Sequence, residues 1–125
     1  MAGSGLGFTH DLQIGNEYES DLAAILRSTG DKIEVKADFR AAETGNVFIE
    51  FSQPSGPSGL ATTHAEWWAI YVVGAYTWLI VGTHRLKELC RIAYQEEHTA
   101  NGGDGNRFKG VLLPISWLTD KDRRA

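Results

Sequence analysis

Three side chains in the first half of the sequence have types and spacing that could do chemistry. Lys36 and Asp38 fall on one face of a predicted strand, and Glu50 falls in the next predicted strand. Carboxylates that converge from separate elements repel one another unless a cation lies between them. Mg²⁺ prefers such carboxylates together with water and phosphate oxygens, and a nearby lysine can orient the attacking water or offset developing charge. The set suits metal-assisted hydrolysis of a phosphodiester.

Two predicted strands must position these residues. Residues 32–39 and residues 47–53 both alternate between apolar and polar side chains, the pattern of a half-buried strand. The short link between them predicts an antiparallel hairpin with a turn near residue 43. That register places Lys36 opposite Glu50 with Asp38 diagonally adjacent, although a slip of one residue would move every side chain to the other face. An ordinary cross-strand ion pair is the alternative interpretation of Lys36 and Glu50.

A helix over residues 16–30 is predicted to supply a further acid. Asn16 can cap it, Glu19 stands three residues later as in a capping box, and Gly30 ends it. Glu19 lies beside the apolar stripe of this helix, so it either reaches the site or serves only in the capping box; both roles remain open.

The rest of the chain completes an α/β fold with a mixed sheet. We expect a loop over 53–59, strands over 67–73 and 76–81, a helix from Thr83 or His84, a flexible loop over 101–106 and a last strand over 111–115. With 125 residues, 42% hydrophobic and 22% charged, the chain predicts one domain over 1–125, with 1–14 and 119–125 as flexible ends.

Composition and motifs exclude several classes of protein. A net charge of -4 argues against coating nucleic acid by bulk charge, although it allows a local basic groove. The single cysteine indicates a reducing, intracellular setting. The uncharged stretch 67–83 is too short for a membrane span, no secretory signal is present, and neither zinc spacing nor a phosphate-binding loop occurs. We therefore expect no membrane and no organic cofactor.

Two segments are candidates for contact with nucleic-acid phosphates. The first is the loop after the glycine-rich segment, and the second is the start of the predicted second helix. Their residues are Thr62, Thr63 and His64 in the loop, and His84, Arg85 and Lys87 in the helix. A strand-entry turn and a solvated basic helix face are the alternative interpretations.

The chain resembles the PD-(D/E)XK nuclease superfamily, especially small bacteriophage nucleases and Holliday-junction-resolvase-like proteins. The resemblance covers residues 15–118 and is carried by Glu-Val-Lys-Ala-Asp at 34–38, Glu-Thr-Gly-Asn-Val-Phe-Ile-Glu-Phe at 43–51, and Pro-Ser-Gly-Leu-Ala-Thr-Thr-His-Ala-Glu-Trp at 57–67. It implies a restriction-endonuclease-like core, a mixed sheet flanked by two helices. It also implies a metal site made by Asp38, Glu50, the backbone carbonyl of Phe51 and Glu19.

The sequence departs from the family pattern at one position. The family's Glu-x-Lys would place a lysine two residues after Glu50, where Ser52 stands. Lys36 is the candidate for a displaced lysine. A second match, with Glu34 and Lys36 themselves as Glu-x-Lys, lacks an acid on a preceding strand and ranks second.

The resemblance implies a Mg²⁺-dependent DNA endonuclease, with Mn²⁺ able to substitute and branched DNA as a candidate substrate. Such a small subunit suggests a homodimer, with the strands that end in Val73 or Ile115 as candidate apolar contacts. The location would be the cytoplasm of a bacterial host if the protein is phage-encoded. The alternatives are a catalytically degenerate DNA-binding protein of the same fold and a structural or protein-binding α/β domain.

Overall fold

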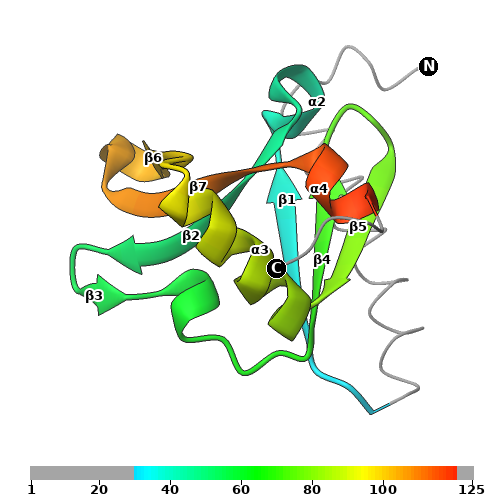
Figure 1. The fold of residues 1–125 in the computed structure, drawn as a ribbon, viewed down its shortest axis with the longest axis horizontal. Coiled ribbons are helices and arrows are strands. Elements are labelled where there is room, and N and C mark those ends of the chain that lie inside the picture. The colour runs from blue at the N-terminus through cyan, green and yellow to red at the C-terminus, as the bar shows by residue number, and fades with distance from the viewer. Residues whose placement is uncertain (1–29, 121–125) are drawn as a thin grey trace.

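The computed structural model describes residues 30–120, which form an α/β arrangement of strands in two sheets with a long helix (Figure 1). The predicted helix over 16–30, with Glu19, lies outside the described residues apart from Gly30. The elements are β1 (Ile33–Asp38), α2 (Ala41–Thr44), β2 (Asn46–Gln53), β3 (Gly56–Pro57), the 3₁₀ turn η2 (Gly59–Ala61), β4 (Trp67–Val72), β5 (Thr77–Gly82), α3 (Thr83–Gln95), β6 (Thr99–Gly102), the 3₁₀ turn η3 (Asp104–Asn106), β7 (Phe108–Pro114) and α4 (Ile115–Thr119).

The first sheet has the strand order β1-β4-β5. β1 runs parallel to β4, from Ile33 beside Trp67 to Asp38 beside Val72. β4 and β5 form the predicted antiparallel hairpin around the turn at Gly74. β4 is buried from Trp68 to Val72, as expected for a near-continuous apolar strand at the centre of a sheet.

The second sheet has the order β3-β2-β7-β6, and all its neighbouring strands are antiparallel. β2 and β7 pair along most of their length, with a bulge between Glu50 and Ser52. Val47 and Ile49 are buried while Phe48 and Glu50 are half-buried, so the predicted alternation of this strand is confirmed. A bulge bends a strand and re-aims the side chains that follow it.

The predicted hairpin between β1 and β2 is wrong. β1 pairs with β4 and β2 pairs with β7, so no ladder joins Lys36 to Glu50. The reason is α2, a short helix where the sequence analysis expects a polar connection; it separates the two strands and ends at Gly45 in the left-handed conformation (φ 76°). The chain is thereby redirected into the second sheet, and the expected single mixed sheet is replaced by two.

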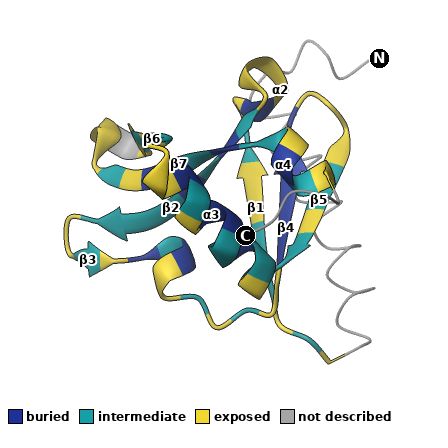
Figure 2. Ribbon diagram, in the orientation of Figure 1, coloured by how far each residue is buried: buried dark blue, intermediate teal, exposed yellow. Residues whose placement is uncertain are grey.

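One hydrophobic core joins both sheets to α3 (Figure 2). α3 buries Leu86, Leu89, Cys90 and Ala93, the four residues that its periodicity predicts. They pack with residues of the central strands of each sheet, including Trp68, Ile49 and Leu113. Burying large apolar side chains is the main stabilising term in a domain of this size.

Three further expectations need correction. The loop expected over 53–59 contains the short strand β3, and the loop expected over 101–106 begins within β6, because both strands complete ladders beside longer ones. The last strand begins at Phe108 rather than at residue 111. Val73 itself is only 6% exposed and Ile115 packs against the core, so an apolar contact between subunits would come from other residues of the strands that end there.

No helix within residues 30–120 is long and apolar enough to cross a membrane.

Candidate functional site

Lys36, Asp38 and Glu50 line one pocket of about 150 Å³ between β1 and β2. The wall is completed by Phe48, by Trp68 and Ile70 of β4, and by the backbone near Ala37 and Ile49. The three residues come together although their strands belong to different sheets. Their juxtaposition depends on how the end of β1 packs against β2, not on a shared ladder.

Asp38 joins these elements through three backbone hydrogen bonds. Its Oδ1 accepts from the N–H of Arg40 at 3.0 Å and of Ala41 at 2.8 Å, at the start of α2. Its Oδ2 accepts from the N–H of Phe48 in β2 at 3.0 Å. A carboxylate offers about four acceptor sites, so three are used and one on Oδ2 remains. Asp38 therefore holds the pocket together as well as facing it.

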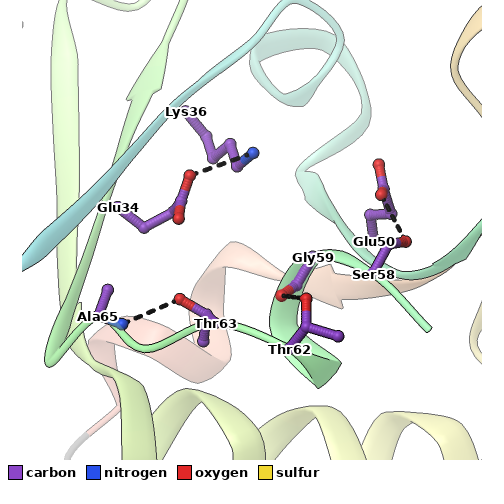
Figure 3. Close-up of polar contacts among 8 residues, drawn as sticks. All are labelled: Glu34, Lys36, Glu50, Ser58, Gly59, Thr62, Thr63 and Ala65. Carbon is purple, nitrogen blue, oxygen red and sulfur yellow. Dashed lines mark hydrogen bonds and ion pairs between the residues drawn. The ribbon is translucent and has the colours of Figure 1, made fainter.

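Glu50 is held by the segment that follows β3. Oγ of Ser58 donates a 2.7 Å hydrogen bond to Oε2 of Glu50 (Figure 3). The N–H of Ser58 donates to the carbonyl of Phe51 at 3.0 Å. Ser58 is 7% exposed, so this bond is shielded from water. Within the described part of the chain, Oε1 of Glu50 accepts no hydrogen bond and stays available to a ligand.

Gly59 allows this close approach. It has a φ of +55°, and a Cβ at this position would lie 2.3 Å from the carbonyl oxygen of Glu50. No side chain fits there without displacing the backbone of β2. Ser58 and Gly59 together brace the segment around Glu50.

Lys36 does not pair with Glu50. Its ammonium lies 3.4 Å from Oε2 of Glu34, two residues earlier on the same face of β1, and 5.8 Å from the ring centroid of Trp68. Both members of the ion pair are well exposed, at 49% and 38%, so it contributes little to stability. In Figure 3 the Lys36 side chain extends from β1 toward the side where Glu50 and Ser58 lie.

Trp68 adds a buried polar atom to the pocket wall. The residue is 2% exposed, and its Nε1–H has no hydrogen-bond partner among residues 30–120. Buried donors usually have a partner, a water or a ligand group included. This N–H is therefore an unsatisfied donor in the residue that lies beneath Lys36.

Mg²⁺ is held in proteins by oxygen atoms in a nearly octahedral arrangement. Among residues 30–120, no three His, Cys, Asp or Glu side chains gather closely enough to hold a metal ion. Two carboxylates nevertheless suffice for Mg²⁺, which keeps several waters. One site on Asp38 and Oε1 of Glu50 are hard oxygen donors, and both residues line the pocket. The chemistry of these two carboxylates suits a partly hydrated ion. Phe51 does not line this pocket, and Glu19 lies outside the described residues.

The residues predicted to contact nucleic acid fall on two neighbouring segments. The N–H of Thr83, the first residue of α3, donates to the carbonyl of Glu66 at 2.9 Å, which joins the helix start to the 62–66 loop. Thr62, His64 and His84 are exposed, and Thr63, Arg85 and Lys87 are half-buried. Oγ1 of Thr63 accepts a hydrogen bond from the N–H of Ala65 at 3.1 Å, so one of its acceptor sites is used within the turn. Nε2 of His84 lies 3.7 Å from Oε1 of Glu88.

Sequence reasoning missed Ser58 and Gly59. It assigned them to a loop of proline and glycine, which is an accurate description of composition. The available signal was a Pro-Ser-Gly run close after a strand with a carboxylate on its polar face. Only the return of the chain against β2 makes that serine a partner of Glu50.

Cys90 is not a candidate nucleophile. It is 7% exposed within the core, and burial raises the pKa of its thiol to about 12. A thiol with such a pKa is protonated at neutral pH and unreactive.

Comparisons of this chain with protein-family models, with curated proteins and with solved structures found no match.

Proposed function

We propose that the protein is a Mg²⁺-dependent DNA endonuclease with a restriction-endonuclease-like core. The observation that carries the proposal is the meeting of Lys36, Asp38 and Glu50 in one pocket, from strands of two different sheets. Charged side chains of both signs around one small pocket suit the recognition of a metal ion and a phosphate together. The resemblance of residues 15–118 to small phage nucleases points to the same chemistry.

In this proposal Asp38 and Glu50 hold the metal, with the Phe51 carbonyl and Glu19 as further ligands. Bound Mg²⁺ would supply Lewis acidity toward the phosphate and toward water. Ser58 fixes the rotamer of Glu50, so that Oε1 is presented in one orientation. A water molecule attacks phosphorus and forms a new phosphorus–oxygen bond, while the bond from phosphorus to the 3′ oxygen breaks and that oxygen takes a proton from solvent. The products are a 5′-phosphate and a 3′-hydroxyl. Lys36, released from Glu34 by the phosphate, offsets the negative charge that develops in this step.

DNA phosphates outside the pocket would contact Thr62, Thr63 and His64 in the loop and His84, Arg85 and Lys87 at the start of α3. The 2.9 Å bond between Thr83 and Glu66 holds these two segments together as one surface. The proposed active form is a homodimer, because a subunit of this size cannot enclose a duplex and paired cuts need two sites.

The test is cleavage of linear duplex, single-stranded, flap and four-way-junction DNA with Mg²⁺, Mn²⁺ or EDTA. Metal-dependent products that vanish in Glu50→Gln are expected. Glu43→Gln changes an exposed glutamate of α2 and serves as the matched control. Equal activity in wild type and Glu50→Gln would overturn the assignment of the site.

A non-catalytic DNA-binding protein is the second candidate, favoured by Ser52 in place of the expected lysine and by the pairing of Lys36 with Glu34. It predicts DNA binding that weakens steeply with salt, without cleavage in any metal. A structural or protein-binding domain predicts no salt-dependent DNA affinity at all. Binding measured beside the cleavage panel separates the three.

A further inference from the structure

A second hollow, of about 600 Å³, lies where the end of α3 meets the second sheet. It opens among β2, β6, β7 and the last turn of α3, and no residue predicted to bind nucleic acid lines it. The side chains that define it are Phe51, Ser52, Tyr94, Thr99, Asn101 and Lys109.

Tyr94 gives this hollow an exposed aromatic ring. The residue is 58% exposed, yet its ring is fixed by an edge-on contact with Phe51, at 5.8 Å between centroids and 86° between planes. A tyrosine ring anchored along one edge and open to solvent offers a flat surface on which a nucleobase can stack.

A row of polar side chains crosses the sheet beside that ring. Ser52 of β2 and Asn101 of β6 both pair in register with Lys109 of β7, so the three lie on adjacent strands in one line. Neighbouring strands are about 4.8 Å apart, so the three side chains are close enough to contact one ligand together.

The charge of the hollow favours an anion. Its lining contains the ammonium of Lys109, the carboxamide of Asn101 and several hydroxyls, but no carboxylate, in a chain whose net charge is -4. Within residues 30–120, Lys109 has no ion-pair partner. An unpaired cation beside an exposed aromatic ring suits a ligand that is both anionic and planar.

The hollow is separate from the pocket described above, although both involve β2. Glu50 pairs with Gly110, and the next pair along the same ladder is Ser52 with Lys109. Successive residues of a strand point to opposite faces of a sheet, so Glu50 and Lys109 occupy opposite faces. The bulge lies between Glu50, which lines the first pocket, and Ser52, which with Phe51 lines the second hollow.

We propose that this hollow is a subsite for one nucleotide of a single-stranded DNA segment. The base stacks on Tyr94, and its phosphate contacts Lys109, Asn101 and Ser52. The inference rests on the proposed function, which it extends by naming a second contact site for DNA, separate from the pocket of Glu50.

The test is fluorescence anisotropy of a labelled oligothymidine in EDTA, where no metal-dependent cleavage takes place. Tyr94→Ala is expected to weaken binding about 5- to 100-fold, the range for loss of one stacked base. Tyr94→Phe keeps the ring and is expected to stay within about twofold of wild type. Lys109→Gln should lower the slope of log affinity against log salt by about 0.7, the value for one phosphate of single-stranded DNA.

Matched controls separate the subsite from general surface effects. Tyr76→Ala removes a tyrosine that is 64% exposed in the β4–β5 turn, and Lys32→Gln removes an exposed lysine before β1; neither should change binding. Equal losses in Tyr94→Ala and Tyr76→Ala, or wild-type binding by a Tyr94→Ala/Lys109→Gln double variant, would overturn the subsite. No binding by the wild type would also overturn it.

The outcome is independent of the proposed cleavage. If Tyr94→Ala and Lys109→Gln weaken binding while the wild type cuts no DNA in any metal, the subsite stands and the nuclease proposal fails. If the wild type cuts DNA and the double variant binds and cuts equally well, the nuclease proposal stands and the subsite fails.

Discussion

Ser58 donates a 2.7 Å hydrogen bond from its hydroxyl to a carboxylate oxygen of Glu50; the serine is buried, at 7% exposed, and the glutamate is half-buried. The same serine donates its backbone N–H to the residue after Glu50, so two bonds bind one turn of chain to β2. One oxygen of Glu50 is thereby fixed and the other is left open. This arrangement makes Ser58 a positioning residue for any ion that Glu50 holds.

Ser58→Ala should therefore affect both stability and metal use. A hydrogen bond to a charged group contributes about 1.5–3 kcal/mol, so we expect a loss of that order in the free energy of unfolding. If Glu50 holds Mg²⁺, the concentration of Mg²⁺ giving half-maximal cleavage should also rise. Urea unfolding and a Mg²⁺ titration measure the two effects. Ser55→Ala, in the exposed turn before β3, is the control and should change neither.

Gly59→Ala should be more damaging than Gly45→Ala. Both glycines have positive φ values, +55° and +76°, and both substitutions carry the cost of an alanine in that conformation. A Cβ at position 45 meets nothing within 4 Å, whereas at 59 it would lie 2.3 Å from the Glu50 carbonyl. We expect about 1 kcal/mol of destabilisation at 45 and at least 1–3 kcal/mol more at 59. Thermal and urea unfolding measure both, and equal losses would contradict the close packing.

Sequence reasoning predicted the strands better than their partners. The alternation in 32–39 and 47–53 identifies two strands correctly. In β2 the buried residues alternate as predicted, whereas no residue of β1 is buried and Ala37 and Phe39 of its apolar face are exposed. Pairing is not local. Four residues, Ala41–Thr44, wind into α2 instead of a turn, and that choice sends β2 to a different sheet.

For the candidate site, too, the residues could be predicted from the sequence but their partners could not. Lys36, Asp38 and Glu50 could be selected by residue type and by the face they occupy, and they do line one pocket. The hydrogen bonds and ion pairs of these residues could not be predicted from the sequence. Asp38 bonds three backbone N–H groups and Lys36 pairs with Glu34, because both outcomes depend on the packing of β1 against α2 and β2.

Asp38→Asn should destabilise the fold itself. The amide keeps the shape of the carboxylate but loses its charge, and its NH₂ group cannot accept from the N–H groups that Oδ1 or Oδ2 now faces. At least one backbone donor is left without an acceptor, at a cost of about 1–3 kcal/mol. Urea unfolding of Asp38→Asn beside Glu43→Gln, an exposed acid of α2, measures this. An unchanged free energy of unfolding would mean that the hydrogen bonds of Asp38 contribute little. A loss of cleavage in Asp38→Asn bears on the metal site only if the variant is folded under the assay conditions.

Because the thiol of Cys90 is buried, the free energy of unfolding should fall at high pH. Burial raises the pKa of its thiol from 9.0 to about 12, so the unfolded chain releases the proton first as pH rises. The stabilisation is complete below pH 9 and is lost progressively between pH 9 and about 12, with a slope approaching 1.4 kcal/mol per unit, or about 2.303RT. Urea unfolding between pH 7 and 10.5 should show this fall in wild type and a shallower one in Cys90→Ala. Parallel curves would contradict the burial of the thiol.

Lys36→Met tests whether the displaced lysine acts in cleavage. Its ion pair with Glu34 is exposed and contributes about 0–1 kcal/mol, so the free energy of unfolding should barely change, while the aliphatic part of the side chain is kept. If Lys36 offsets charge at the phosphate, kcat should fall about 100-fold or more, as on loss of one electrostatic donor to a transition state. Glu34→Gln removes the partner and leaves Lys36 free, so its kcat should match or exceed that of the wild type. A Lys36→Met variant with full kcat would show that Lys36 is only a surface ion pair, whatever the nuclease activity of the chain.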